Sequence, residues 1–428
     1  MRPNSIRLPH RKDAEQLTTQ TLPTPKMVLV PLSQHMGAPC SPLVKVGDEV
    51  RAGEKIGDSE AFFSAPIHAP VTGKVTAVTE YLPISGKPCA AIAIEAATEQ
   101  REPVGTPPDV TDRESFLAAV RASGAVGLGG AGFPTHVKLA FDPQKTPVDV
   151  LIVNAAECEP HITSDYRELM ESPDDVLGGI RAVLTHLSIP RAIIGIESNK
   201  PAAIALLRER TKGMADIAVA ALPSAYPQGA EKVLIYSTTK RTVKEGELPL
   251  HQGVVVMNCS TLGFLHRYLQ TGIPLIQRRI TVGGDCVERP CNVFVPIGTP
   301  IAEVLAFAGL VKEPRKVLMG GPMMGLCVPD TATPVVKQNN AILALHDTAE
   351  KRTTACLRCS RCLEVCPVRL MPNAIERAYR RHDPKRLAAL HVGLCVNCGS
   401  CTYICPAARP LAETNQLAKT YLAAHHPN

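Results

Sequence analysis

The chain has 428 residues, which suits two to four domains, and its 45% apolar and 20% charged residues are ordinary for a protein that buries a core. A net charge of +6 without a long basic run is too mild to indicate nucleic acid as a partner, although it fits weak attraction to an acidic partner or to an anionic surface. No apolar run approaches the roughly 18 residues of a membrane-spanning helix, and the polar first residues are unlike a signal peptide. We therefore expect no direct membrane span and a reducing, cytoplasmic setting.

The N-terminal region predicts an arm followed by a small β module. Residues 1–26 are polar and dotted with proline, and we expect a flexible or docking arm. In residues 27–105, alternating apolar residues between Gly-Asp and Thr-Gly turns predict short strands at Met27–Pro31, Val44–Val50, Ala69–Val75 and Ala91–Ala96. The segments VKVGDEVRAGEKIG and APVTGKV resemble sequences of the barrel-sandwich fold of biotinyl and lipoyl carrier domains. A carrier needs a lysine on its hairpin tip, but residues 60–66 have phenylalanine there, so we expect a docking or structural role.

Residues 110–250 alternate between helix and strand patterns, which predicts an α/β domain with a layered, parallel sheet. The expected helices are Glu114–Ala122, capped by Asp112, then Asp174–His186, Lys200–Lys212 and one beginning at Glu231; the expected strands are Val148–Val153, Arg191–Ile196 and Ile217–Leu222. Residues 251–345 return to short strands and glycine turns, which predicts a small α+β module. Residues 350–428 form a cysteine-rich domain with a helical tail.

A glycine-rich loop, GLGGAGFP at residues 127–134, lies early in the α/β region. It contains a nominal G-x-G-x-x-G, but a helix precedes it where the dinucleotide fingerprint needs a strand. Missing side chains still let backbone N–H groups approach a phosphate or a planar ring. We expect Pro134 to begin a helix whose N-terminus faces such a ligand, with Lys138 within reach of a phosphate. The alternative is a glycine hinge that binds nothing.

Polar residues and glycines follow several expected strands, where open α/β sheets bind their ligands. They comprise the segment from Asn154 to Pro160, which includes Glu157 and Glu159, the segment from Tyr226 to Lys232, and Asn258. Amides and carboxylates suit hydrogen bonds to a ribityl or ribose chain or to a nicotinamide, whereas each segment alone could be a solvated turn. Together with the cysteine runs below, they favour a flavin pocket.

Eight cysteines near the C-terminus stand in two copies of C-x2-C-x2-C-x3-C-P, the spacing of paired ferredoxin-type [4Fe–4S] sites. In this pattern the fourth cysteine of each run binds the other cluster. We therefore predict that Cys356, Cys359, Cys362 and Cys405 hold the first cluster, and that Cys395, Cys398, Cys401 and Cys366 hold the second. Structural zinc or redox thiols are the alternatives for a single C-x2-C. Two complete copies make them poor explanations.

Three segments, GLGGAGFPTHVK, NAAECEP and QGAEK, resemble the flavin- and NADH-binding subunit of respiratory complex I and its diaphorase relatives. The order of the modules is similar to that of the C subunit of Rnf (Rsx) electron-transport complexes: a carrier-like module, a flavin fold, a small ligand-binding-type (SLBB-like, β-grasp-like) module and an all-α twin-cluster domain. This resemblance covers roughly residues 27–415. Complex I relatives carry Arg at the position of Leu128 and Glu at the position of Ala230.

The resemblance implies which residues bind the cofactors. FMN would lie on Gly127, Gly129, Gly130, Gly132 and Lys138, and Asn154, Glu157, Gly229, Glu231 and Asn258 would complete its site. NADH would stack on the flavin near Phe133 and Glu159. No catalytic acid or base is expected, because the cofactor supplies the chemistry of hydride transfer.

The expected function is electron exchange between NAD(H), at FMN, and two [4Fe–4S] clusters, in a translocase that oxidises or reduces ferredoxin. The resemblance implies a peripheral subunit on the cytoplasmic side of the bacterial inner membrane. Its partners would be integral-membrane and iron–sulfur subunits of the same complex, with ferredoxin reached indirectly. The alternatives are a soluble flavin and iron–sulfur cobalamin reductase of propanediol-degrading microcompartments, and an iron–sulfur electron wire or scaffold without flavin.

Overall fold

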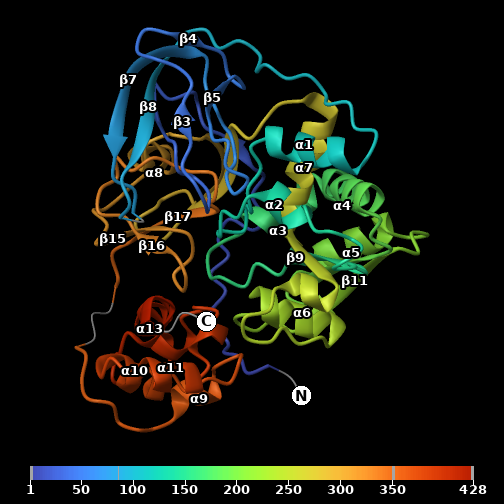
Figure 1. Cartoon of the computed structure of the whole chain (residues 1–428). Coiled ribbons are helices and arrows are strands. Elements are labelled where there is room, and N and C mark those ends of the chain that lie inside the picture. The colour runs from blue at the N-terminus through green and yellow to red at the C-terminus, as the bar shows by residue number, and fades with distance from the viewer. Residues whose placement is uncertain (1–2, 85, 349–351, 426–428) are drawn as a thin grey trace.

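A computed structural model describes residues 3–84, 86–348 and 352–425 and has four packed regions (Figure 1). The N-terminal module consists of two small sheets, ordered β2-β8-β7-β4 and β3-β5-β6. Its strands are β2 (Met27–Pro31), β3 (Ser41–Pro42), β4 (Glu49–Val50), β5 (Lys55–Asp58), β6 (Ile67–His68), β7 (Gly73–Tyr81) and β8 (Cys89–Ala96). The strand predicted at 27–31 is confirmed. The one predicted at 44–50 is mostly loop, and the one at 69–75 is displaced toward the C-terminus.

Residues 3–26 form a strap that lies along the rest of the protein, which agrees with a docking arm and not with a flexible one. Ile6 is buried and exchanges two backbone hydrogen bonds of 2.9 Å with Tyr226. Further along, β1 (Gln20–Thr21) pairs in parallel with β14 (Cys291–Pro296). Between them, the Lys12 ammonium group donates to three backbone carbonyls, those of Glu157, Glu159 and Ile162. The polar composition alone could not distinguish a flexible arm from a docking arm, because these partners lie more than a hundred residues away in the sequence.

The α/β region contains a four-stranded parallel sheet in the order β11-β10-β9-β12. Its strands are β9 (Val150–Ala155), β10 (Ala192–Glu197), β11 (Ile217–Leu222) and β12 (Val254–Asn258), and its helices are α1 (Arg113–Ala122), α2 (Thr135–Leu139), α3 (Ser164–Glu171), α4 (Pro173–Leu187), α5 (Pro201–Arg210), α6 (Glu231–Thr239) and α7 (Cys259–Thr271), with a 3-10 turn η1 (Pro249–Gln252). The predicted strands and long helices are confirmed, to within two residues at most ends.

Two expectations for this region need correction. The boundary predicted at residue 250 is wrong, because β12 pairs with β9 and α7 packs against α4, so the α/β layer extends to Thr271. The helix after the glycine loop begins at Thr135, with Pro134 as its N-cap, and has only five residues. So short a helix has little macrodipole, and its N-terminus cannot account for anion binding.

The third region is a six-stranded mixed sheet in the order β1-β14-β13-β17-β15-β16. Besides β1 and β14 it contains β13 (Gln277–Gly283), β15 (Lys316–Met319), β16 (Leu326–Cys327) and β17 (Ala341–Leu345), covered by α8 (Ile301–Ala308). Its core packs Ile280, Val293 and Val304, each fully buried. The predicted α+β character is confirmed, and the arm contributes an edge strand to it.

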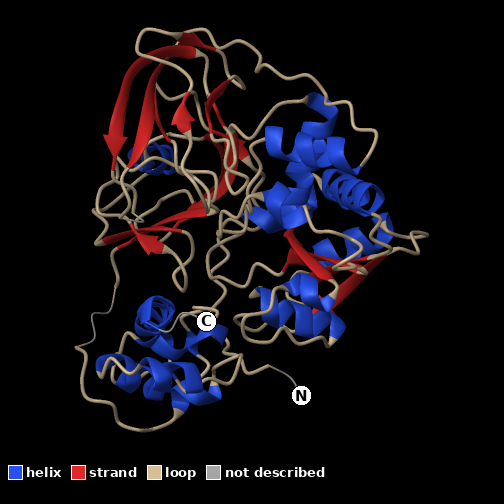
Figure 2. Cartoon of the chain, viewed as in Figure 1, coloured by secondary structure: helices blue, strands red, loops and turns tan. Residues whose placement is uncertain are grey.

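Helices and loops alone make up the described C-terminal residues 352–425 (Figure 2). The helices are α9 (Arg361–Glu364), α10 (Pro372–Arg380), α11 (Pro384–Ala389), α12 (Ser400–Tyr403) and α13 (Leu411–His425), with a 3-10 turn η2 (Val392–Leu394). The small helices α9 and α12 each carry the third cysteine of a run. Helix α13 folds back on α10 and gives the domain its own apolar core.

Candidate functional site

The glycine loop closes on itself and is fixed at Leu128. The Gly127 N–H donates to the carbonyl of Phe133 at 2.8 Å. The Leu128 N–H donates to Thr261 Oγ1 at 3.0 Å, and the Leu128 carbonyl accepts from the buried Arg278 guanidinium at 3.0 Å. Helix α7 and strand β13 therefore hold the loop. Sequence reasoning missed Thr261 and Arg278, for which no motif gave a signal.

The top of the loop offers an open backbone surface. Among the described residues, the N–H groups of Gly129, Gly130 and Ala131 donate no hydrogen bond to the protein. A Cβ atom added at Gly130 would meet no atom within 4 Å, and its φ of 109° is one that glycine adopts readily. Consecutive unpaired amides that lack large side chains suit a phosphate or another anion.

The structure brings most predicted flavin residues to one edge of the sheet. Asn154 and Asn258 are partners in register at the carboxyl ends of β9 and β12. Asn154 Nδ2 donates to the carbonyl of Gly229 at 2.9 Å, which joins two of the predicted segments. A Cβ at Gly129 would lie 3.3 Å from Asn258 Nδ2, so the loop and this strand end are in contact.

The polar side chains at this edge already have protein partners. Lys138 Nζ lies 3.1 Å from Glu231 Oε1 and donates to the carbonyl of Val256 at 3.1 Å. Asn258 Nδ2 donates to Asp165 Oδ2 at 2.6 Å, and Asp165 also accepts from Ser260. Asp165, which no motif indicated, therefore orients a predicted flavin residue. Burial raises the pKa of Asp165.

The two predicted glutamates have different surroundings. Glu157 accepts hydrogen bonds from the backbone N–H groups of Asp165 at 2.7 Å and Tyr166 at 3.2 Å, so it caps α3. Glu159 Oε2 accepts from the N–H of Met323 at 3.1 Å, and its Oε1 is buried without a partner among the described residues. Burial raises the pKa of each carboxyl group to about 7, and nearby Lys12 partly offsets this rise.

The tip of the N-terminal module packs on the same loop. The ring of Phe63 meets the ring of Phe133 edge-on, with centroids 5.0 Å apart, and the Met36 N–H donates to the carbonyl of Gly132 at 3.0 Å. The carbonyl oxygen of Phe62 lies 3.0 Å from Nε2 of His136, in the short helix α2 that follows the loop. The phenylalanines at the tip thus make a contact within the chain, which fits the expected docking or structural role.

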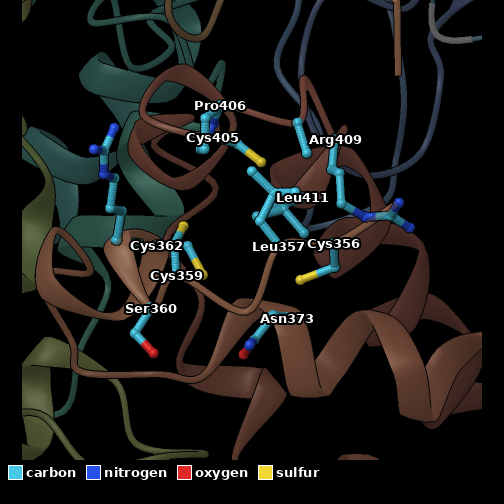
Figure 3. Close-up of a pocket in the computed structure, with 12 residues that line it drawn as sticks. Cys356, Leu357, Cys359, Ser360, Cys362, Asn373, Cys405, Pro406, Arg409 and Leu411 are labelled. Carbon is cyan, nitrogen blue, oxygen red and sulfur yellow. The ribbon is translucent and has the colours of Figure 1, made fainter. Parts of the chain in front are cut away.

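The cysteines predicted for the first cluster surround one pocket in the C-terminal domain (Figure 3). Cys356 and Cys359 are exposed, Cys405 is half-buried and Cys362 is buried. No group of three His, Cys, Asp or Glu side chains in the described ranges is arranged to hold a single metal ion. Four thiols around a shared pocket instead suit a wider group, such as a cubane.

The cysteines predicted for the second cluster are mostly enclosed. Burial raises the pKa of the Cys401 thiol, and the neighbouring thiols of Cys398, Cys395 and Cys366 raise it further, which places all four near one another. The Leu370 N–H donates to Cys366 Sγ at 3.2 Å, and Asn415 Nδ2 lies 3.6 Å from Cys395 Sγ. Hydrogen bonds to sulfur are typical of cluster ligands.

A contact at Tyr226, the junction, joins the α/β region to the C-terminal domain. Tyr226, in the middle of the β11–α6 connection, donates its hydroxyl to the carbonyl of Cys398 at 2.6 Å. Ile6, Val365 and Met323 pack around it, so the strap, the C-terminal domain and the loop after β15 meet there. Sequence reasoning identified Tyr226 only as the start of a turn, and no motif gave a signal for this contact.

Comparisons with known proteins agree with this architecture. Family models match as the RnfC barrel sandwich hybrid domain at residues 3–99, the Nuo51 FMN-binding domain at 120–267, the SLBB domain at 279–326 and the 4Fe-4S dicluster domain at 355–408. A solved NAD+-reducing [NiFe]-hydrogenase chain, 21% identical, aligns with a TM-score of 0.52 over 73% of this chain and 62% of its own, which supports the fold alone. Among the described residues, every helix is too short or too polar to span a bilayer.

Curated relatives indicate the family more specifically than the domain matches do. The C subunit of the proton-translocating ferredoxin:NAD(+) oxidoreductase complex of Clostridium ljungdahlii is 41% identical over 86% of this chain and 82% of its own length. The corresponding subunit of the Na(+)-translocating complex of Acetobacterium woodii is 39% identical over 84% of this chain and 82% of its own. The C subunit of an ion-translocating oxidoreductase complex of Pseudomonas aeruginosa is 40% identical, over 87% of this chain and 49% of its own. This chain belongs to the family of C subunits of ion-translocating ferredoxin:NAD(+) oxidoreductase (Rnf) complexes.

Proposed function

We propose that this subunit exchanges electrons between NAD(H), at a bound FMN, and two [4Fe–4S] clusters within a membrane ferredoxin:NAD oxidoreductase complex. The FMN-binding and dicluster domains and the names of the relatives support it. When bound, a flavin accepts the two electrons of a hydride and releases them singly, whereas a cluster carries one. The protein's task is to bind, orient and connect these groups.

For FMN, we propose the loop glycines Gly127, Gly129, Gly130 and Gly132 as the backbone cradle of the phosphate, with Lys138 as its counter-charge. The unpaired amides at the top of the loop support this role. Asn154, Gly229, Glu231 and Asn258 would line the remainder of the site. Glu157 would act by fixing the start of α3 behind it. Phe133 and Glu159 are proposed on the NADH side.

For the clusters, we propose the crossed ligand sets, with Cys356, Cys359, Cys362 and Cys405 in one and Cys395, Cys398, Cys401 and Cys366 in the other. The shared pocket of the first set and the mutual electrostatic effects within the second support this pairing.

The observation that carries the proposal is the junction at Tyr226. This residue lies three positions before Gly229 of the proposed flavin site and touches Cys398 of the proposed cluster site. Tyr226 and the short stretch of chain from it to Gly229 therefore link the two proposed cofactor sites, without an intervening domain. An iron–sulfur scaffold without flavin would need no such connection to the segment that carries Gly229.

We propose a peripheral position on the cytoplasmic side of the bacterial inner membrane. Integral-membrane and iron–sulfur subunits of the same complex would be the partners, and ferredoxin would be reached through them. The names of the relatives, as subunits of ion-translocating ferredoxin:NAD(+) oxidoreductase complexes, support an assembly of several subunits. The same names do not favour the soluble cobalamin reductase.

The test is the absorption spectrum of the chain purified without oxygen. We expect one flavin and about eight iron atoms per chain, and bleaching of both chromophores when NADH is added. A spectrum of clusters alone, unchanged by added FMN and NADH, would establish the scaffold instead. Bound zinc in place of iron would overturn the cluster assignment.

A further inference from the structure

Two lysines hold the loop that follows β9. This β9–α3 loop, residues 156–163, contains two non-glycine residues with positive φ, Glu157 at 48° and His161 at 68°. Residues with a side chain seldom adopt this left-handed backbone, and it persists only where surrounding contacts impose it. The contacts come from Lys12 in the strap and from Lys200, the N-cap residue of α5.

The two lysines bind four backbone carbonyls of this loop. Lys12 Nζ donates to three of them, those of Glu157, Glu159 and Ile162. Lys200 is buried, and its Nζ donates to the carbonyl of Ala156 at 2.8 Å. Glu197 accepts from the same ammonium group at 3.1 Å, so the buried charge of Lys200 is paired. Most carbonyls in the first half of the loop therefore have a charged donor.

The amide groups of the same stretch have no partner. Within the described part of the chain, the N–H groups of Glu157, Cys158 and Glu159 donate no hydrogen bond to the protein. In a planar trans peptide the C=O and N–H bonds point in opposite directions. The N–H of Glu157 therefore points away from Lys200, and the N–H of Cys158 points away from Lys12. The lysines thus fix the direction in which these amides face.

The other neighbours of the loop belong to the proposed flavin site or support it. The Gly229 N–H donates to Cys158 Sγ at 3.4 Å, and a Cβ atom added at Gly229 would lie 3.5 Å from the same sulfur. Glu157 accepts from the N–H of Asp165, whose carboxylate in turn binds Asn258. The strap and α5 themselves supply no residue of the proposed flavin site. The loop therefore contacts the two lysines and the proposed flavin site at once.

We propose that Lys12 and Lys200 are positioning residues of the flavin site, which hold the free amides of the β9–α3 loop toward the bound flavin. This inference rests on the proposed function. Reduction adds electron density to the flavin ring, and N–H donors that face the ring stabilise the reduced form more than the oxidised form. The strap is then part of the redox site as well as of the fold. Neither lysine touches the flavin; each acts through the backbone that it holds.

The experiment measures the dissociation constants of oxidised and of dithionite-reduced FMN from the intact, anaerobically purified protein, together with the midpoint potential of the bound flavin. One test variant is Lys12→Met. The other combines Lys200→Met with Glu197→Gln, so that no unpaired charge stays buried. Lys12→Arg restores a charged donor at the first position.

The matched control is Arg241→Met. The Arg241 guanidinium donates to the Asp149 carboxylate at 2.6 Å and to the carbonyl of Gln252 at 2.9 Å, at the amino ends of β9 and β12. The control therefore loses a charged donor to the backbone at the edge of the sheet opposite the β9–α3 loop.

We expect both test variants to weaken the binding of reduced FMN about tenfold more than that of oxidised FMN, which lowers the two-electron midpoint potential by about 30 mV. Lys12→Arg should keep most of the preference for the reduced form. The Arg241 control should leave the ratio of the two dissociation constants within about twofold of the wild type, because distant sites act independently. An unchanged ratio in the test variants would overturn the proposal, since a lysine that only stabilises the fold affects both forms of FMN alike.

The wild type separates the failures of the two proposals. A wild type that binds no FMN would refute the proposed function itself. If the wild type binds FMN and the lysine variants match the Arg241 control, only the positioning role is wrong. Should Lys12→Met fail to fold, Lys12→Gln takes its place, because a shorter and neutral side chain must also lower the midpoint potential. A potential equal to that of the wild type in Lys12→Gln would overturn the proposal in the same way.

Discussion

The proposed cluster sites and the proposed flavin site differ in how far along the chain their residues are spread. Three ligands of each cluster lie within seven consecutive residues, and only the fourth comes from the other run. The flavin residues extend from Gly127 to Asn258 and meet only because β9 and β12 are neighbours in the sheet. The first kind of site is encoded by local spacing, whereas the second depends on the whole α/β layer. The two should therefore respond differently to substitution.

The largest expected effect is the separate loss of each cofactor. Gly129→Trp places an indole where a Cβ alone would lie 3.3 Å from Asn258 Nδ2, so flavin should be lost while about eight iron atoms remain. Cys356→Ala should remove cluster signal and leave flavin and the reduction of ferricyanide by NADH. Flavin and iron analysis of purified protein checks both, and Gly129→Ala is the mild control. Loss of iron from the tryptophan variant would mean that the two sites are not independent.

This difference also explains what could be predicted from the sequence. Spacing indicated the cysteine sets, and periodicity placed the strand at Ile217–Leu222 at its observed bounds. Asp165 and Arg278 were missed because each acts on a partner far away in the sequence, at separations of 93 and 150 residues, and nothing near them in the sequence is unusual. The short helix α3 was also missed. Its capping residue Glu157 lies seven residues before the first residue of the helix, so the sequence next to the helix start gives no capping signal.

The next largest effect is expected at the strap, which spans both regions. Lys12→Met removes a charged donor from three backbone carbonyls, and we expect a loss of about 3 kcal/mol in the free energy of unfolding. Urea unfolding of the anaerobic protein measures it. Lys26→Met, at an exposed position near the end of the strap, is the control and should change stability by less than about 0.5 kcal/mol. Equal effects would mean that the strap contributes no stability through Lys12.

A smaller, pH-dependent effect is expected at Glu159, beside the flavin region. Its pKa is raised from 4.5 to about 7 in the folded protein, so between these values the folded state binds more protons than the unfolded state. Stability therefore falls as pH rises through this window. Glu159→Gln should raise stability by about 2 kcal/mol at pH near 8 and leave it unchanged at pH near 4.5.

Thermal unfolding at the two pH values measures the difference for Glu159→Gln. Glu303→Gln, in the exposed part of α8, controls for the loss of one negative charge. The same gain at both pH values would exclude titration of Glu159 as its cause.

The smallest expected effect lies at the junction, where the two regions touch. Tyr226→Phe keeps the ring in its apolar surroundings but leaves the carbonyl of Cys398 without its 2.6 Å donor, which costs about 1 to 1.5 kcal/mol. Because about 1.4 kcal/mol is a factor of ten, amide hydrogen exchange around Cys398 should quicken about tenfold. Tyr421→Phe is the matched control, since its hydroxyl donates to the His382 carbonyl at 3.1 Å within the C-terminal domain. If both variants quicken exchange around Cys398 equally, the effect is a general loosening of that domain. Faster exchange in the Tyr226 variant alone, with iron and flavin retained, would locate the weak point between the regions rather than within either.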